Sequence, residues 1–245
     1  MDQKISMPHV INTLQNGKIS ILQQLQGGNN YTFLIRADEG NHNLKAVYKP
    51  VKGEQPLWDF LPATLARREV AAFILSEISG WHFVPPTIYR KSDLPLGAGS
   101  LQLYIEPDFD HHFFNFSENE IQSLRHVVLF DLIINNADRK AGHVFLDQNQ
   151  HLWLIDHGLC FHEEDKLRTV IWNFAGEKIS EKLITDLNHL QAALKMDQKK
   201  LVVKLKRLIS PNEFLALQVR IANLIASPYF PYPKKDRRSY PWPLI

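Results

Sequence analysis

Short apolar runs separated by turn-forming residues fill the first part of the chain. Their alternation of apolar and polar positions is typical of β-strands, and the Gly- and Asn-containing stretches between them predict hairpin turns. Residues 64–80 instead place apolar side chains at helical spacing and end in Gly80, a typical C-terminal cap. The pattern therefore predicts a sheet accompanied by one helix. The expected strands are residues 18–26, 31–37, 44–50, 84–90 and 100–107.

From Ser117 onward the pattern becomes mainly helical. Ser117 and Glu120 have the spacing of a capping box, which predicts a helix running through residue 136. Two short apolar segments, 143–147 and 151–156, are joined by a polar turn and predict a β-hairpin. The hairpin is thus expected between two polar loops that carry acidic residues.

The C-terminal part contains further amphipathic segments. Residues 180–226 predict two or three helices, whereas the tail, defined as residues 229–245, is too rich in proline for regular structure. The stretch 196–209 is basic on a helical pattern, which we interpret as a solvated helix face rather than a membrane or nucleic-acid surface.

Composition narrows the range of functions. The 245 residues are enough to bury a full core, and 28 basic against 26 acidic residues leave a net charge of only +2, which argues against a nucleic-acid partner. The single cysteine, Cys160, excludes an internal disulfide and favours a reducing, cytoplasmic compartment. No stretch approaches the roughly 18 apolar residues of a membrane span, so none is expected. The composition does not indicate an oligomeric state.

Two loops contain the residues best suited to chemistry. The Asp138 loop, NNADRKAGH at 135–143, follows an apolar helix, and the Asp156 loop, IDHG at 155–158, follows the hairpin. Phosphoryl transfer needs one carboxylate to orient or deprotonate the acceptor and another to hold a metal ion on the nucleotide phosphates. The layout places Asp138 and Asp156 near each other at the mouth of a cleft, which indicates phosphoryl transfer.

These two loops resemble the catalytic and metal-binding loops of the phosphatidylinositol 3-/4-kinase superfamily, especially the type II phosphatidylinositol 4-kinases and a bacterial phosphatidylinositol kinase-like subfamily. Upstream, AVYKP resembles the family's lysine strand, RREVAAFILSE its helix with the pairing glutamate, and FVPPT and SLQLYIE the strands before the hinge. The resemblance covers roughly residues 18–165. It implies one α+β, two-lobed protein-kinase-like domain over residues 1–245, with an antiparallel-sheet N-lobe at 1–106 and a mainly helical C-lobe at 107–228.

The resemblance also implies cofactors and residue roles. The cofactors would be ATP and a divalent metal ion, Mg²⁺ or Mn²⁺, with Asp138 and Arg139 catalytic and Asp156 a metal ligand. His143 stands five residues after Asp138, where the family has asparagine, and would be the second metal ligand. The positions assigned to the nucleotide are Lys49, Glu69, Gly27, Gly28, Asn29, Asn30, Gln102, Tyr104, Ile105 and Glu106.

Each assignment has a structural alternative. Lys49 could be an ordinary surface lysine, the Asp138 loop could merely cap helix ends, and His143 could be a structural residue at the hairpin entrance. The ordered series of lysine, glutamate and two aspartates favours the functional interpretation.

The expected function is ATP-dependent phosphoryl transfer to an unidentified acceptor, which could be a small molecule, a lipid head group or a protein. The cysteine-rich insertion of the type II lipid kinases is absent, which makes a lipid acceptor doubtful. One alternative is a nucleotide-binding pseudokinase that has lost catalysis through His143 and His157, and another is a nucleotidyl transferase. A third is a metal-dependent phosphohydrolase, which would use several imidazoles around the two aspartates. These imidazoles are His157, His162, His111 and His112.

Overall fold

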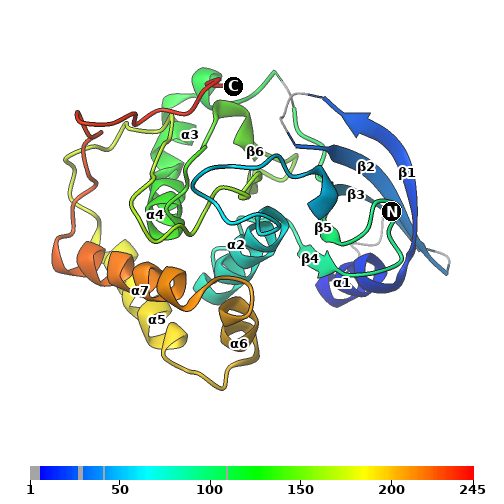
Figure 1. The fold of residues 1–245 in the computed structure, drawn as a ribbon. Coiled ribbons are helices and arrows are strands. Elements are labelled where there is room, and N and C mark those ends of the chain that lie inside the picture. Colours follow the sequence, from blue (N-terminus) through cyan, green and yellow to red (C-terminus); the bar gives the residue numbers. More distant parts are fainter. Residues whose placement is uncertain (1–5, 27–29, 41, 109) are drawn as a thin grey trace.

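The computed structural model describes residues 6–26, 30–40, 42–108 and 110–245 and has two lobes (Figure 1). Five antiparallel strands form the sheet of one lobe, in the order β1-β2-β3-β5-β4. The α+β, two-lobed architecture with an antiparallel-sheet lobe and a mainly helical lobe is therefore confirmed. The strands are β1 (Lys18–Leu25), β2 (Thr32–Glu39), β3 (His42–Pro50), β4 (Thr87–Arg90) and β5 (Gly99–Leu103).

Strands β4 and β5 are shorter than the sequence pattern predicts. The expectation of strands over 84–90 and 100–107 was wrong at the outer ends, because the ladder begins at Thr87 and stops at Leu103. Pro85 and Pro86 have no backbone N–H to donate to a ladder. After Leu103 the chain leaves the sheet and connects the two lobes.

Helix α1 (Met7–Asn16) covers one face of the sheet and was not expected from the sequence. Its buried side chains Val10 and Leu14 pack with Ile35 of β2 and Tyr48 of β3 in the core of the sheet lobe. Because Leu44, Ala46 and Tyr48 alternate inward toward this core, the intervening residues of β3, Lys49 among them, lie on the opposite face of the sheet.

Helix α2 (Leu65–Ser79) joins the two lobes. It ends at Gly80, whose φ of 74° confirms the expected left-handed cap. The helix contacts β4 and β5, yet its side chains from Val70 to Leu75 belong to the large core of the helical lobe. A residue on α2 is therefore held between the sheet and the helices, which fixes the position of Glu69.

The helical lobe differs from the prediction at one point. The capping box of Ser117 and Glu120 is present, but the helix expected to run through residue 136 is interrupted at Leu124. Leu124 has a ψ of 0° and a completely buried side chain, so the chain turns there to bury it. The helices of this lobe are α3 (Glu118–Ser123), α4 (Arg125–Ile134), α5 (Glu181–Leu194), α6 (Lys200–Lys206) and α7 (Pro211–Ala226).

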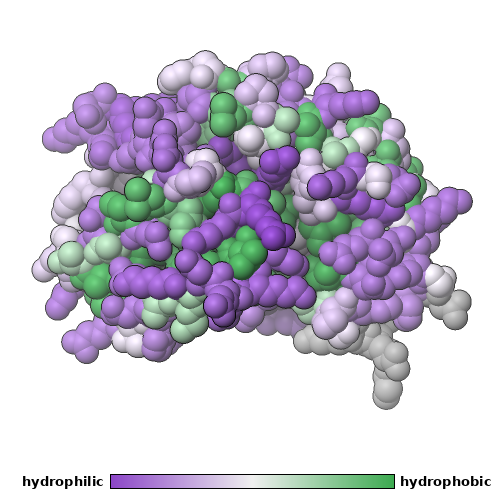
Figure 2. Space-filling model, turned by 60° about the horizontal axis from the view of Figure 1, so that its bottom comes forward, coloured by the Kyte–Doolittle hydropathy of each residue, from purple (hydrophilic) through white to green (hydrophobic). Residues whose placement is uncertain are grey.

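The hairpin and the C-terminal part agree with the sequence pattern. Strands β6 (Val144–Leu146) and β7 (Leu152–Leu154) form the expected hairpin, and the tail contains no helix or strand. Helix α6 buries Val202 and Leu205 and exposes its lysines, on a face of the molecule that is mostly hydrophilic (Figure 2). Among the described helices, none has both the length and the apolar run that a bilayer crossing requires.

Candidate active site

Lys49 lies on the face of β3 opposite the sheet core and points toward the helical lobe. Its ammonium group pairs with two carboxylates, Glu69 Oε1 of α2 and Asp156 Oδ1 at a distance of 2.8 Å. Glu69 is almost completely buried, and its second oxygen, Oε2, accepts a hydrogen bond of 2.9 Å from the backbone N–H of His157. Glu69 thus ties the lysine strand to the Asp156 loop.

Asp156 is held in an unusual backbone conformation. Its φ is 60°, in the left-handed region that a non-glycine residue seldom adopts, and such strain is concentrated at functional sites. The carboxylate extends from the loop after β7 and remains 47% exposed although it pairs with Lys49. Its other oxygen, Oδ2, lies 3.4 Å from His143 Nε2. Asp156 therefore presents a free side to a ligand.

Asp138 occupies the loop that follows α4. Asn135 ends that helix with a φ of 55°, and the side chain of Asn136 accepts a hydrogen bond of 3.0 Å from the N–H of Asp138. The Asp138 carboxylate is 26% exposed and lies 3.5 Å from the ammonium of Lys140. Burial raises the pKa of Asp138 to about 6, with Lys140 opposing the rise and Asp156 adding to it. A carboxylate with this pKa can take up a proton near neutral pH.

Arg139 is completely buried and connects the two loops. Its guanidinium forms a bidentate ion pair with Asp131, with Nε–Oδ2 and Nη2–Oδ1 distances of 2.9 Å. It also donates to the carbonyl oxygens of His143 at 3.1 Å and Ile155 at 3.0 Å. A residue without exposure cannot touch a substrate, so the contacts of Arg139 support a positioning role within the catalytic assignment made from sequence.

His157 accepts from Arg139 and is a neutral imidazole. Arginine has only donors, so the 3.0 Å contact between Arg139 Nη2 and His157 Nε2 requires an unprotonated Nε2. Burial, followed by the charge of Arg139, holds the pKa of His157 well below its usual range. His157 is therefore part of the buried support of the Asp156 loop and does not face the cleft.

The electrostatics favour a charged lysine and a charged aspartate at the centre of the site. Burial acts to lower the pKa of Lys49, but Asp156 and Glu69 outweigh it and raise the pKa. Burial acts to raise the pKa of Asp156, yet Lys49 and then His143 hold it below its usual range. Burial lowers the pKa of His143 to about 4 against the pull of Asp156. His143 is neutral at pH 7, which is the form that binds metals.

Asp156 Oδ2 and His143 Nε2 are suitably placed to be two ligands of one divalent ion, which would also bind a phosphate group. Two ligands about 2.1 Å from one ion and at roughly a right angle stand about 3 Å apart, and Asp156 Oδ2 and His143 Nε2 are separated by 3.4 Å. Within the described ranges no three His, Cys, Asp or Glu side chains converge on a metal position. The remaining ligands of an ion between these two side chains would come from phosphates and water.

The glycine- and asparagine-containing turn at 27–30, which was assigned to the nucleotide, is described only at Asn30. Gly27, Gly28 and Asn29 lie outside the described residues, whereas Asn30 is described and its side chain accepts a 2.7 Å hydrogen bond from the N–H of Gln55. Asn30 thus connects the turn to the segment between β3 and α2.

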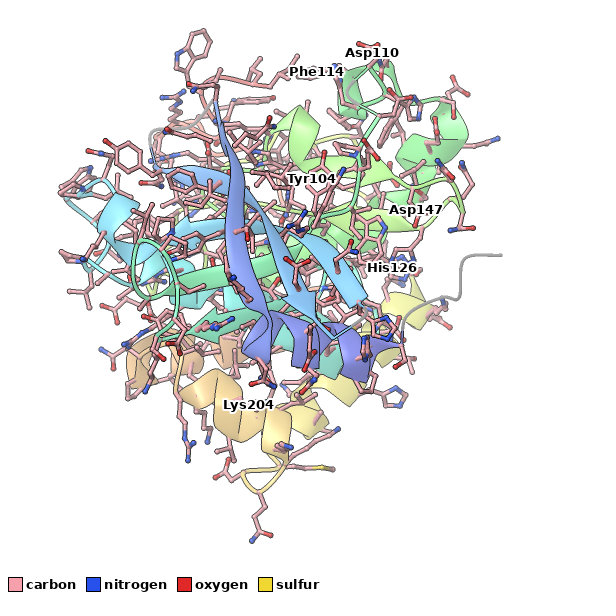
Figure 3. The ribbon with its side chains drawn as sticks, turned by 90° about the vertical axis from the view of Figure 1, so that its right-hand side faces the viewer. Tyr104, Asp110, Phe114, His126, Asp147 and Lys204 are labelled. Atoms are coloured by element: carbon pink, nitrogen blue, oxygen red, sulfur yellow. The ribbon has the colours of Figure 1, made fainter. Side chains whose placement is uncertain are left out.

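Tyr104, Ile105 and Glu106, which were assigned to the nucleotide, lie in the connection between the lobes, and Gln102 lies in β5 just before it. Gln102 is buried, and its side-chain amide donates a 2.9 Å hydrogen bond to the hydroxyl of Thr87. The backbone N–H of Tyr104 donates a 3.0 Å hydrogen bond to the carbonyl oxygen of Lys45. In the described part of the chain the N–H groups of Ile105 and Glu106 donate no hydrogen bond. Figure 3 shows Tyr104 where the sheet meets the helical lobe. These backbone groups are suited to read the edge of a base.

His111, His112 and His162 are engaged in contacts away from Asp138 and Asp156. His111 pairs with Glu120 at 2.8 Å, and His112 caps the short turn at 113–115. His162 accepts from the N–H of Glu164 at 3.0 Å and packs against Phe60. Each ring is thus engaged elsewhere, which weakens the basis for a phosphohydrolase centre.

Two further residues of the site, Lys140 and Asp131, were not predicted from the sequence. Lys140 is the closest cation to Asp138, and its position in the same loop was the available signal. Asp131 interrupts the apolar run VVLFDLII in α4, and a carboxylate in such a run indicates a buried partner, here Arg139.

The fold and the convergence of these side chains define a two-lobed protein with a kinase-like fold, as comparison with solved structures confirms. A Golgi casein kinase with Mn and ADP bound superposes with a TM-score of 0.60 at 16% identity, over 90% of this chain and 74% of that one. Hydra Fam20 with sugar gives a TM-score of 0.57 at 16% identity, over 91% and 88%.

No family model matches the sequence. Protein Rv2133c of Mycobacterium tuberculosis (strain ATCC 25618 / H37Rv) is 35% identical over 265 aligned residues, which cover 94% of this chain and 93% of that protein. The chain therefore belongs to the same family as Protein Rv2133c. Phosphatidylinositol 4-kinase gamma 4 of Oryza sativa subsp. japonica is 27% identical over 66% of this chain and 34% of the rice protein. The match thus spans about a third of the plant kinase.

Proposed function

We propose that this protein is an ATP-dependent phosphotransferase that transfers the γ-phosphoryl group to a hydroxyl group of an acceptor. The observation that carries the proposal is the cluster of Lys49, Glu69 and Asp156. Three elements that are distant in the sequence bring one ammonium and two carboxylates together between the lobes. A lysine held this way is ready for phosphate oxygens, and Asp156 keeps one oxygen available for a cation.

In the proposed reaction the nucleotide lies between the lobes. Its base would contact the backbone of Ile105 and Glu106, and its phosphates would contact Lys49. Asp156 and His143 would hold the divalent ion, which when bound neutralises part of the phosphate charge. The fold shared with the Golgi casein kinase that binds Mn and ADP supports these cofactors.

Asp138 is proposed to receive the proton. The acceptor oxygen forms a bond to the γ-phosphorus while the bond from that phosphorus to the bridging oxygen breaks, and ADP leaves. The hydroxyl proton passes to the Asp138 carboxylate, whose raised pKa suits this role. Arg139 and Asp131 hold the Asp138 loop from behind without touching the reacting atoms.

We further propose that the protein belongs to the phosphatidylinositol 3-/4-kinase-like superfamily, in which the two lobes and the tail act as one catalytic domain. The match to the rice phosphatidylinositol 4-kinase and the motif resemblance support this assignment. The acceptor would be a small molecule, a lipid head group or a protein.

Labelled ATP tests the proposed function against two of the alternatives, the nucleotidyl transferase and the pseudokinase. The protein is incubated with ATP labelled at the γ- or α-position, with Mg²⁺ or Mn²⁺, and with Asp138→Asn as the matched control. We expect the γ-label to move to an acceptor or to the protein itself, and to do so only in the wild-type chain. Transfer of the α-label would instead identify a nucleotidyl transferase. ATP binding without transfer from either position would identify a pseudokinase altered at His143 and His157.

A further inference from the structure

The tail returns across the helical lobe and ends beside the Asp138 loop (Figure 1). It leaves α7, crosses the segment 165–172, and brings Leu244 to Ala141, whose N–H donates a 2.8 Å hydrogen bond to the Leu244 carbonyl oxygen. Ala141 lies between Asp138 and His143 in the loop. The tail therefore contacts the loop that carries both proposed functional side chains.

This contact satisfies a buried backbone donor. Ala141 is completely buried and begins the short 3-10 turn Ala141–His143, so its N–H has no partner within the turn. A buried N–H without an acceptor is costly, and the Leu244 carbonyl supplies the acceptor. Without the tail, the Asp138 loop would have to rearrange or admit water.

A second contact of the tail, at Ser239, also supplies an acceptor to a buried backbone donor. Ser239 is buried, and its carbonyl oxygen accepts from the N–H of Thr169 at 3.1 Å and from Trp172 Nε1 at 3.3 Å. Thr169 is itself buried, so its N–H also depends on the tail for an acceptor. A third anchor is ionic, because Asp165 pairs with Lys234 at 2.7 Å and with Arg237 at 2.5 Å.

The segment held by these anchors is joined directly to the Asp138 loop. The backbone N–H of Arg139 donates to the carbonyl oxygen of Arg168 at 3.0 Å, and the backbone N–H of Val170 donates to the carbonyl oxygen of Arg139 at 3.1 Å. The N–H of Arg168 donates to Asn136 at 2.9 Å. The tail thus fastens both the loop and the segment that supports it.

We propose that residues 239–244 are a positioning strap that holds the Asp138 loop in the geometry required for phosphoryl transfer. The proposal rests on the proposed function, in which Asp138 must stand within reach of an acceptor. The strap does not act as a plug, since the carboxylates of Asp138 and Asp156 keep 26% and 47% exposure with the tail in place. The groups that do the positioning are the carbonyls of Ser239 and Leu244.

The test removes the Leu244 carbonyl together with the side chains of Leu244 and Ile245. A chain ending at Pro243 lacks this acceptor but keeps Ser239, and Ile245→Ala, at a side chain with 62% exposure, is the matched control that retains it. Asp165→Asn is a second variant that weakens the ionic anchor without shortening the chain. Three quantities are measured: hydrogen exchange of the amides in 139–143, kcat for transfer of the γ-label, and ATP affinity.

In the shortened chain we expect faster exchange at 139–143 with unchanged exchange in α2, and kcat lower by roughly ten- to a hundredfold, with ATP affinity measured without metal retained because Lys49 lies outside the strapped loop. Asp165→Asn should speed exchange in 165–172, and Ile245→Ala should match the wild type. Unchanged exchange at 139–143 in the shortened chain would overturn the proposal, and so would a rise in kcat, which would make the tail inhibitory. If the wild-type chain transfers no label, the proposed function fails, whereas exchange still decides whether the strap holds the loop.

Discussion

The buried ion pair of Arg139 and Asp131 allows a quantitative prediction about stability. The two side chains have exposures of 0% and 2%, so Asp131→Asn leaves the guanidinium buried without a compensating charge. Breaking a buried pair on one side costs about 3–5 kcal/mol, against a total stability of about 5–15 kcal/mol for a domain. The hydrogen bond from Asn136 to Asp131 Oδ1 is disturbed as well. We therefore expect Asp131→Asn to remove about a fifth or more of the free energy of unfolding.

An exposed pair of the same residue types supplies the control. Arg36 and Asp38 contact at 3.0 Å with side-chain exposures of 51% and 36%, so Asp38→Asn should cost about 0–1 kcal/mol. The assay is urea unfolding followed by tryptophan fluorescence, with the midpoint and slope compared among the three chains. A loss for Asp131→Asn as small as that for Asp38→Asn would refute the view that the Arg139 cluster supports both loops.

The remaining predictions concern the cleft. Lys49→Met should weaken ATP binding about ten- to a hundredfold in calorimetry through the loss of a charge-assisted contact, while the circular dichroism spectrum stays unchanged. His143→Asn should shift the metal preference of ATP binding toward Mg²⁺, and His143→Ala should weaken metal-dependent binding; equal affinities and preferences in both variants would make His143 structural. Asp138→Asn should lower kcat about 10²- to 10⁴-fold with ATP affinity retained. Because protonation of Asp138 increases below its pKa of about 6, the wild-type rate should fall as the pH drops through that value, and a flat profile would exclude Asp138 as the base.

Much of the sheet lobe could be predicted because its signals are local. The alternation along β3 and the glycine after α2 each reflect a preference of a few neighbouring residues. Helix α1 was missed because its apolar positions, Val10 and Leu14, are few and become decisive only against the sheet. The break at Leu124 likewise depends on the burial of one side chain by distant elements.

In the site, too, residues within short motifs could be recognised from the sequence, whereas contacts between distant segments could not. The resemblance to a kinase family was enough to single out Lys49, Glu69 and Asp156, which the structure brings into one cluster. The buried position of Arg139 could not be foreseen, because its partners in α4 and the Asp156 loop meet only after folding. The course of the tail over the Asp138 loop depends on backbone acceptors, and side-chain identity carries no signal for such contacts.

In the proposed mechanism, Asp156 and His143 hold a metal ion on a nucleotide whose phosphates contact Lys49. A crystal structure of the protein with ADP and Mn²⁺, with the ion located by its anomalous scattering, tests this arrangement. We expect an anomalous peak within about 2.3 Å of both Asp156 Oδ2 and His143 Nε2, and phosphate oxygens within hydrogen-bonding distance of Lys49 Nζ. Nucleotide bound elsewhere, or a peak bound by neither residue, would contradict it.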